Sequence, residues 1–434
     1  MFSTFPIFSE FDKKTQNQLT NLATLLPFTF SEKKILCDLV ADFISWQTGL
    51  FSSIIMEFKL DWLKVDGDNF VLLSDKLDLK QAAKFLFDKL VDYHKALTLQ
   101  PKDYATFNAN PSSCKNSSHC NLSLKEVSAP AKILGHCPVA STKTRCCNLM
   151  TLDVVMQCGF DCSYCSIQSF YYNNQISFIA DLPLALNKIK LDPNRRYHIG
   201  TGQSSDSLMW GNKNGLLEAL FKFARENQNV ILEMKSKSDN VDWVVKQAQK
   251  GLVPKNVIFT WSLNPQDVIR VEERYSASLQ NRIAAAKKIS EVGLLVGFHF
   301  HPIIYYKNWR ADYLEVVNQL VSNFTPNQII TISLGTLTFI KPVIKKIKKR
   351  LMPSLILQMP LSEASGKLSY PLEIKEELFC TVYSFFPSAW RQNIFFYLCM
   401  EDPSLWKKVF GREYKSNEEF EEAMLDHYFK AVTF

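Results

Sequence analysis

The sequence lacks an apolar run long enough to cross a lipid bilayer. One of its longest apolar segments, Asn393–Met400, is far shorter than the roughly 20 residues that a transmembrane helix needs. We therefore predict no membrane span. The opening residues, Met1–Pro6, also lack the basic and apolar regions of a secretory leader. Disulfide frameworks are typical of short secreted chains, so the 11 cysteines of this 434-residue chain indicate a reducing, cytoplasmic location.

A strong excess of charge of either sign is missing as well. The formal net charge is +7, and 47% apolar with 21% charged residues is ordinary for a soluble chain of two or three domains. Lysine outnumbers arginine, which favours diffuse attraction to phosphate over bidentate reading of bases. The composition therefore permits an anionic partner such as nucleic acid without requiring one.

Three closely spaced cysteines are the most informative feature that is present. Cys158, Cys162 and Cys165 follow the spacing CxxxCxxC, with Tyr164 between the last two. Thiolates are the usual ligands of iron–sulfur clusters, and three of them hold three irons of a 4Fe–4S cubane and leave the fourth open. This spacing resembles the signature of the radical S-adenosylmethionine (radical SAM) enzymes, in which SAM binds the open iron. A zinc site normally needs four ligands, and no second CxxC pair follows at the usual distance, so zinc is the weaker interpretation.

The first 110 residues read as a helical domain without a catalytic constellation. Ser31 is a candidate N-cap for a helix over Glu32–Trp46, in which apolar residues recur at helical spacing. Leu79–Leu99 repeats this pattern. A packing or docking domain is the simplest interpretation.

Two further segments flank the central part of the chain. A loop-rich connector, 111–148, carries Cys114, His119 and Cys120 as candidate metal ligands, although a surface loop explains such a group more often when no fourth ligand follows. A C-terminal α+β extension, 341–434, begins with the basic helical segment Lys341–Arg350. These cations could follow a phosphate backbone, and a solvated helix face is the more frequent explanation.

Strand and helix patterns alternate strictly over residues 149–340. Six strands are expected at Thr151–Met156, Tyr197–Gly200, Val230–Met234, Val257–Leu263, Leu295–Phe300 and Ile329–Leu334. The intervening helices are expected near Ile176–Lys190, Leu216–Asn227, Val241–Lys250, Leu279–Val292 and Tyr313–Asn323. This alternation predicts a parallel α/β sheet. The cysteines follow the first strand, where barrel enzymes place their chemistry, so we predict a partial (β/α)6 barrel of the TIM type rather than a doubly wound sheet.

Polar residues stand where several of these strands end. The turn Gly200–Asp206 contains Gly200 and Gly202, which would let backbone approach a ligand closely, although one glycine pair is weak evidence. Lys237 ends the third strand, and a lysine there can pair with a carboxylate of the cofactor. His299 and His301 share one face of the fifth strand, where contact with a substrate and burial in the core are about equally expected.

The chain resembles the spore photoproduct lyases and their radical SAM relatives from about Cys137 to Gly411. The resemblance rests on several blocks in one order: Cys158–Cys165, Gly200–Asp206, Lys235–Ser238, Trp261–Pro265, Gly297–Ile303, Ser333–Thr336 and Tyr397–Glu401. The resemblance implies a 4Fe–4S cluster and SAM as cofactors and the repair of a thymine photoproduct in DNA as the activity. A low-potential electron donor such as flavodoxin or ferredoxin, and DNA with a pyrimidine lesion, are the implied partners.

The resemblance also implies roles for individual residues. Cys158, Cys162 and Cys165 correspond to the cluster ligands, and Ser205, Lys237 and Ser262 to contacts of SAM. In the family a cysteine in the turn after the second strand, helped by two tyrosines around the third cluster cysteine, returns a hydrogen atom to the product. This chain has Gln203 in place of that cysteine, and it has Tyr164 but Ser166 in place of the second tyrosine. An amide and a hydroxyl are poor hydrogen-atom donors, so this relay departs from the family.

The hairpin that wedges the lesion in the family is the second departure. The corresponding segment, Gly366–Tyr370, keeps only Lys367 and Tyr370 of its basic and aromatic character. Two alternatives to photoproduct repair therefore stay open. One is a radical SAM reaction of the same group on another substrate, and the other is a non-catalytic iron–sulfur protein that binds nucleic acid.

Overall fold

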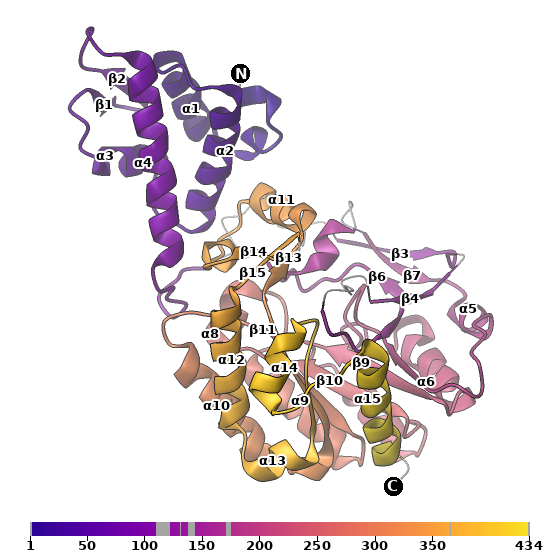
Figure 1. Cartoon of the computed structure of the whole chain (residues 1–434). Helices are drawn as coiled ribbons and strands as arrows, with labels where there is room; N and C mark the ends of the chain where they lie inside the picture. The colour runs from indigo at the N-terminus through magenta and orange to yellow at the C-terminus, as the bar shows by residue number, and fades with distance from the viewer. Residues whose placement is uncertain are drawn as a thin grey trace. The chain divides into compact units, whose positions relative to one another are not determined.

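The computed structural model describes residues 2–109, 122–130, 132–137, 144–170, 175–364 and 366–432. The chain forms two compact units, Met1–Ser117 with Phe339–Ser362 and Ser118–Thr338 with Glu363–Phe434. Cys114, His119 and Cys120, the candidate ligands of the connector, lie outside the described residues. The elements of both units are labelled in Figure 1.

The first unit is built mainly from helices. Its elements are η1 (Phe2–Thr4), η2 (Phe8–Glu10), α1 (Lys13–Leu25), α2 (Phe30–Ser45), α3 (Phe51–Glu57), β1 (Leu63–Asp66), β2 (Asn69–Leu72), α4 (Leu79–Leu99), α11 (Lys341–Arg350) and η8 (Ile356–Gln358). The predicted N-cap at Ser31 is wrong. Thr29 caps α2 instead, because its hydroxyl accepts from the backbone N–H of Glu32 while Glu32 bonds back to Thr29, which forms a complete capping box.

The basic helix α11 packs within this unit through its apolar and part of its charged face. Val343 and Ile347 are buried. Lys348 donates to the buried carboxylate of Asp42 on α2 at 2.7 Å, and Lys349 pairs with Glu10 at 3.3 Å. Lys348 therefore contributes to the packing of the unit, whereas Lys349 lies on the solvated face of the helix.

The second unit is centred on an eight-stranded sheet. Its strand order is β16–β12–β11–β10–β9–β8–β5–β4. The strands are β4 (Leu134–His136), β5 (Met150–Leu152), β8 (Tyr197–Gly200), β9 (Val230–Ser236), β10 (Val257–Ser262), β11 (Val296–Ile303), β12 (Ile329–Thr336) and β16 (Phe395–Leu398). All neighbours from β5 to β16 pair in parallel, and only β4 is antiparallel.

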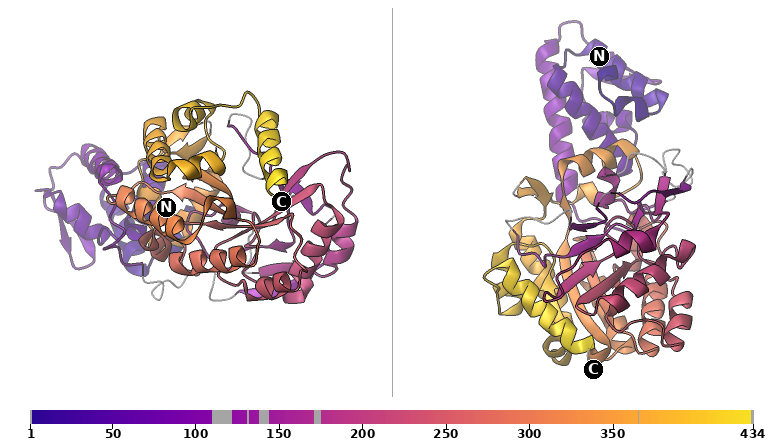
Figure 2. Two further views of the ribbon diagram at one scale, coloured as in Figure 1. Left: turned by 90° about the horizontal axis from the view of Figure 1, so that it is seen from below. Right: turned by 90° about the vertical axis from the view of Figure 1, so that its right-hand side faces the viewer.

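This strand order decides between the two α/β architectures. The six predicted strands lie side by side in chain order, as in a barrel, whereas a doubly wound sheet reverses its order at a switch point. The sheet is curled into a half-barrel, and seen from below its connecting helices form an arc outside the strands (Figure 2). A seventh parallel strand, β16, comes from the C-terminal part and extends this sheet.

The helices of the second unit largely follow the predicted positions. They are α5 (Leu182–Asn187), α6 (Leu216–Glu226), α7 (Asp242–Gln249), α8 (Gln266–Glu272), α9 (Leu279–Glu291), α10 (Trp309–Asn323), α12 (Leu372–Phe385), α13 (Ser388–Asn393), α14 (Pro403–Phe410) and α15 (Asn417–Val432), with short 3-10 turns η5 (Ser166–Ser169), η6 (Lys213–Gly215) and η7 (Pro326–Gln328). No helix among the described ranges has the length and apolar character that a bilayer crossing demands.

Two local predictions are wrong around the cysteine loop. The expected helix at 176–190 begins instead with the strand β7 (Gln175–Ile179), which pairs with β3 (Ser123–Val127) and β6 (Val155–Met156). Its β-branched and aromatic residues suit a buried strand, and these partners satisfy its backbone. The expected strand 151–156 is split, because β5 ends at Leu152 and β6 joins β7 in a second sheet.

The segment that corresponds to the family's wedge also has a packing role. The remaining short strands are β13 (Thr338–Phe339), β14 (Ser362–Ala364) and β15 (Lys367–Ser369). Tyr370 is 1% exposed, and its hydroxyl accepts from the backbone N–H of Tyr305 at 3.0 Å. Tyr370 is therefore a core residue and does not present its ring to solvent.

Candidate active site

The three motif cysteines lie in one loop that turns back on itself between β6 and η5. Gln157 and Asp161 adopt left-handed backbone conformations, with φ of 73° and 53°, and the N–H of Cys165 donates to the carbonyl of Cys162 at 3.2 Å. The thiols lie close enough for the charges of Cys162 and Cys165 to act on Cys158. The loop therefore gathers all three thiols.

Burial dominates the protonation of these thiols. It raises the pKa of Cys158 and of Cys162 well above the ordinary thiol value, while the cations Lys237 and Arg282 act in the opposite direction on Cys162. A metal that displaces the proton would be bound by a desolvated, strongly basic thiolate. Metal binding must therefore overcome this preference for the protonated thiol, and the cations Lys237 and Arg282 lower that cost at Cys162.

Among the described residues, the motif cysteines do not form a site for a single metal ion. Within the described ranges, no three Cys, His, Asp or Glu side chains converge in the way one bound metal ion requires. Three cysteines that each bind a different iron of a cubane do not have to converge on one point. The Met209 side chain packs against Gly159 of this loop, where an added Cβ would lie 2.4 Å from Cε of Met209.

The turn after β8 holds the start of the cysteine loop. The hydroxyl of Ser204 donates to the carbonyl of Val155 at 2.9 Å, and that of Ser205 donates to the carbonyl of Gln157 at 2.8 Å. Gln203, the residue in the expected donor position, immediately precedes these two serines and is half-buried. Ser205 thus fixes the backbone directly before Cys158.

The two glycines of this turn have different reasons to be glycine. Gly202 has φ of 87°, and a Cβ there would lie 2.6 Å from the carbonyl oxygen of Lys235. Close approach to β9 therefore excludes any side chain at Gly202. Gly200 is buried against Leu149, whose side chain would lie 3.2 Å from an added Cβ.

Asp206 ends the same turn and was not singled out as a site residue. Its buried carboxylate accepts from the Ser236 hydroxyl at 2.8 Å and from the backbone N–H of Lys237 at 2.7 Å. It also accepts from the N–H groups of Leu208 and Met209. Burial raises its pKa, and these hydrogen bonds oppose the shift. Asp206 therefore places the end of β9, including Lys237, beside the β8 turn.

Lys237 and Tyr164 meet beside the cysteines. The Lys237 ammonium lies 5.6 Å from the centroid of the Tyr164 ring, within the range of a cation–π contact. Burial acts to lower the pKa of Lys237, but Glu273 and Cys162 hold it above its ordinary value. Burial and the neighbouring Glu273 raise the pKa of Tyr164 well above its ordinary range. Lys237 is thus a cation, and Tyr164 a neutral phenol, at this site.

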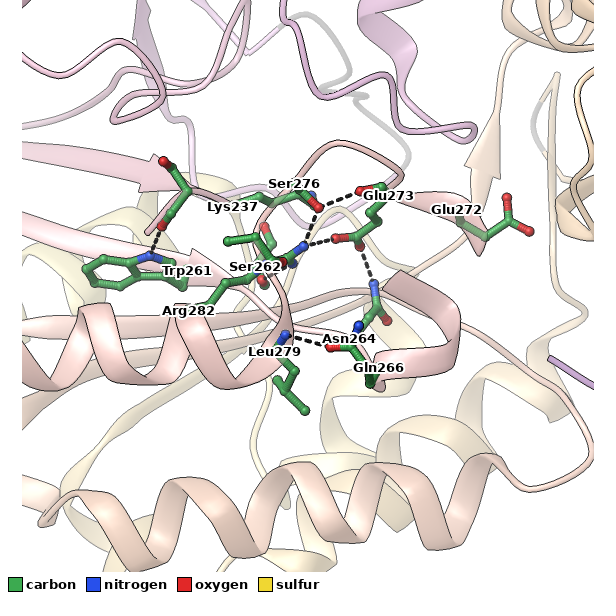
Figure 3. A network of polar contacts seen from close by, with 12 residues as sticks. Lys237, Trp261, Ser262, Asn264, Gln266, Glu272, Glu273, Ser276, Leu279 and Arg282 are labelled. Atoms are coloured by element: carbon green, nitrogen blue, oxygen red, sulfur yellow. Dashed lines mark hydrogen bonds and ion pairs between the residues drawn. The ribbon is translucent and has the colours of Figure 1, made fainter. Parts of the chain in front are cut away.

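One buried carboxylate, Glu273, connects these residues to β10 (Figure 3). It accepts from the Tyr164 hydroxyl and from Nδ2 of Asn264, the latter at 2.8 Å, and it pairs with the fully buried Arg282 at 2.6 Å. Although burial opposes it, Arg282 and then Lys237 lower the pKa of Glu273 to about 2. Arg282 in turn donates to the carbonyl of Ser262 at 2.8 Å. Neither Glu273 nor Arg282 was singled out from the sequence. Glu273 lies in a run of charged residues, 272–274, and Arg282 lies in a polar helical segment, so neither pattern indicates burial.

A second polar network lies on the concave face of the half-barrel. His299 bonds Glu233 through Nε2 at 2.7 Å and Ser333 through Nδ1 at 2.6 Å, and His198 also bonds Glu233 at 2.7 Å. Burial, followed by the charge of Lys235, lowers the pKa of His299 to about 4. His299 is therefore a neutral, hydrogen-bonded residue of the concave face. The ring of His301 packs against Gly335, where an added Cβ would lie 2.8 Å from the ring.

Four further cysteines gather elsewhere in this unit, at the ends of β4 and β16. They are Cys137, Cys146, Cys147 and Cys399. A hydrogen bond from Cys147 lowers the pKa of Cys146 to about 7, and the same bond and burial raise the pKa of Cys147. No spacing pattern in the sequence connects them.

Comparisons with known proteins agree on one family. The family model described as spore photoproduct lyase matches residues 191–369. The spore photoproduct lyase of Geobacillus sp. (strain Y412MC61) is 26% identical over 172 residues, which cover 36% of this chain and 49% of that protein. The chain thus matches about half the length of this curated relative.

Solved structures support the same fold. A tyrosine-to-phenylalanine variant of spore photoproduct lyase superposes with a TM-score of 0.55 at 19% identity, covering 65% of this chain and 84% of that one. A doubly substituted variant with bound AdoMet and dinucleoside spore photoproduct gives a TM-score of 0.52 at 17% identity, covering 72% and 94%. By these comparisons the chain is similar to the spore photoproduct lyases over the matched residues, and the solved structures show that it shares their fold.

Proposed function

We propose that this protein is a radical SAM lyase that repairs a thymine photoproduct in DNA. The observation that carries the proposal is the single loop that gathers Cys158, Cys162 and Cys165 next to the Lys237 cation, in a chain that is similar to the spore photoproduct lyases. When bound, a 4Fe–4S cluster and SAM supply a 5'-deoxyadenosyl radical by reductive cleavage of SAM. A low-potential flavodoxin or ferredoxin provides the electron.

The residues around the loop have complementary tasks in this proposal. Cys158, Cys162 and Cys165 would hold the cluster through three of its irons, so that the fourth iron would be available to SAM. Lys237 attracts the SAM carboxylate, and its neighbourhood of buried carboxylate and phenol keeps it charged. Ser262 and the β8 turn, with Gly200, Gly202 and Ser205, line the approach to the same strand ends, and Ser205 also holds the cysteine loop.

The substrate proposal rests on the relatives. A solved relative carries dinucleoside spore photoproduct together with AdoMet. A lesion in duplex DNA must leave the base stack to reach the concave face of a half-barrel, and damage lowers that cost, which is a few kcal/mol.

A second candidate function is a radical SAM reaction of the same group on another substrate. Gln203 favours it, because an amide cannot return a hydrogen atom as a thiol does, and Ser166 removes the second phenol. Tyr164 is the remaining phenol of the relay, and its hydroxyl is engaged with Glu273.

Anaerobic reconstitution of the full chain tests the proposal. The protein should bind a 4Fe–4S cluster, produce 5'-deoxyadenosine from SAM and a reductant, and consume dinucleoside spore photoproduct, with thymidine and trapped adducts measured separately. SAM cleavage without consumption of photoproduct would favour another substrate. A fully loaded cluster without any SAM cleavage would leave only a non-catalytic nucleic-acid-binding protein.

The variant Gln203→Cys sharpens the substrate test. If Gln203 stands in the donor position, the wild type should release trapped adducts, and the cysteine variant should give clean repair. Equal product mixtures from both proteins would contradict this placement of Gln203.

A further inference from the structure

Residues 272–275, which begin at the last residue of α8, accept or donate hydrogen bonds along the cysteine loop. Ser163 donates through both its N–H and its hydroxyl to Glu272, the backbone bond measuring 2.8 Å. Tyr164 donates to Glu273. Arg274 and Tyr275 donate to the carbonyls of the loop residues Asp161 and Phe160 at 3.3 Å each. We call residues 272–275 the acidic brace.

Within the acidic brace, Glu273 is the junction of three elements. Glu273 accepts a hydrogen bond from Tyr164 of the cysteine loop. The Tyr164 ring makes a cation–π contact with the ammonium of Lys237, which directly follows β9. Through Asn264 and Arg282, Glu273 reaches the end of β10 and the start of α9. Figure 3 shows that Arg282 and Asn264 both contact the same carboxylate. Residues from separate parts of the sequence are thus held by one side chain.

Because Glu273 is buried, its negative charge acts strongly on neighbouring groups. Glu273 and Arg282 are both 0% exposed, so the pair is screened very little by solvent. A buried negative charge opposes the addition of an electron nearby. If the carboxylate is removed, the positive charge of Arg282 stays behind, and both changes favour a reduced, more negative neighbour.

We propose that Glu273 is a positioning residue that holds Tyr164 and Lys237 in place for SAM and keeps the reduction potential of the bound cluster low. This inference rests on the proposed function, because it assumes that the loop binds the cluster. It assigns a task to a residue that is neither a cluster ligand nor a predicted SAM contact.

The variant Glu273→Gln removes the charge and keeps the shape of the side chain. We expect the midpoint potential of the cluster to shift in the positive direction and SAM to bind about tenfold more weakly. A change in the EPR spectrum of the reduced cluster on addition of SAM provides a third readout. Glu377→Gln is the matched control, since Glu377 pairs with Arg310 at the surface, and it should change none of these.

A second variant separates charge from misfolding. Glu273→Gln combined with Arg282→Gln removes both charges, so it should return the potential toward that of the wild type while SAM affinity stays low. Loss of iron from Glu273→Gln in a protein with an unchanged melting curve would also support positioning of the loop. An unchanged potential together with SAM affinity within about twofold of the wild type would overturn the inference.

The outcome does not depend on photoproduct repair. Potential and SAM affinity need only the loaded cluster, so a wild type that binds the cluster without repairing the lesion still tests Glu273. Failure of the wild type to bind any cluster would refute the proposed function itself and the inference with it.

Discussion

The protein has two groups of cysteines, and they differ in how they are brought together. Cys158, Cys162 and Cys165 share one loop, and the cations Lys237 and Arg282 act on it. The other group, Cys137, Cys146, Cys147 and Cys399, comes from three segments and is organised by a hydrogen bond between neighbouring thiols. The comparison teaches that sequence spacing sets the first group apart, because charged groups surround both groups and the Lys235 charge acts on Cys399 of the second one. The gathering of thiols alone does not identify a metal-binding loop.

The largest expected effect is on assembly of the iron–sulfur cluster, and it tests the comparison between the two cysteine groups directly. Cys162→Ala should abolish assembly of the iron–sulfur cluster, because one of three irons loses its ligand. Cys147→Ala should leave iron and sulfide content near that of the wild type. Iron and sulfide analysis after reconstitution measures both. Equal losses in the two variants would mean that the second group also takes part in cluster binding.

The turn that supports the first group should tolerate no side chain at Gly202. Gly202→Ala combines a positive φ with a Cβ 2.6 Å from a backbone oxygen, so we expect a loss of about 3 kcal/mol in the free energy of unfolding. Gly293→Ala is the control, because its φ is 80° and no atom lies within 4 Å of the added Cβ. It should cost about 1 kcal/mol. Urea unfolding of both variants checks the difference, and equal losses would assign the cost to backbone strain alone.

Lowering the pH should reduce the stability that Glu273 of the acidic brace provides. The pKa of Glu273 falls from 4.5 to about 2 on folding, so its contribution to stability is complete above about pH 4.5 and is lost as the pH falls toward 2. Between about pH 5 and about pH 3, the wild type should lose about 2 kcal/mol more unfolding free energy than Glu273→Gln. Denaturant unfolding at both pH values measures this. Parallel losses would show that Glu273 titrates normally.

The smallest effect compares two lysines of β9. Lys237→Gln should weaken SAM binding about tenfold, since a charged hydrogen bond contributes roughly 1.5 kcal/mol or more. Lys235→Gln should change it less than about twofold, because the charge of Lys235 acts on His299 and on Cys399 of the second group. Equilibrium binding of SAM to the two reconstituted variants measures both losses of affinity. A larger loss in Lys235→Gln than in Lys237→Gln would contradict the placement of Lys237.

Several elements of both units are predictable from local pattern. Tyr197–Gly200 and Leu79–Leu99 match the structure at both ends, because continuous β-branched runs and long helical spacing are strong local signals. The segment Gln175–Ile179 was misread as helix, since only its pairing with β3 and β6 makes it a strand. The beginning of α2 was misplaced by two residues, because Ser31 and Thr29 are both good N-cap residues.

The candidate site is predictable only in part for a related reason. Tyr164, Lys237 and Ser262 were singled out from strand ends and family blocks, and the structure brings the first two to Glu273 and the third to Arg282. Glu273 and Arg282 themselves resemble surface residues in the sequence. Their burial results from the way that α8 and α9 fold over the end of β10.

By itself the sequence determined the spacing of the three motif cysteines and the alternation of strands and helices along the chain, because both depend on residues that are near in the chain. The tertiary structure decided which carboxylates and cations surround the cysteine loop and which other cysteines meet. Burial makes these contacts strong, and burial is a property of the packed fold that no short stretch of sequence records.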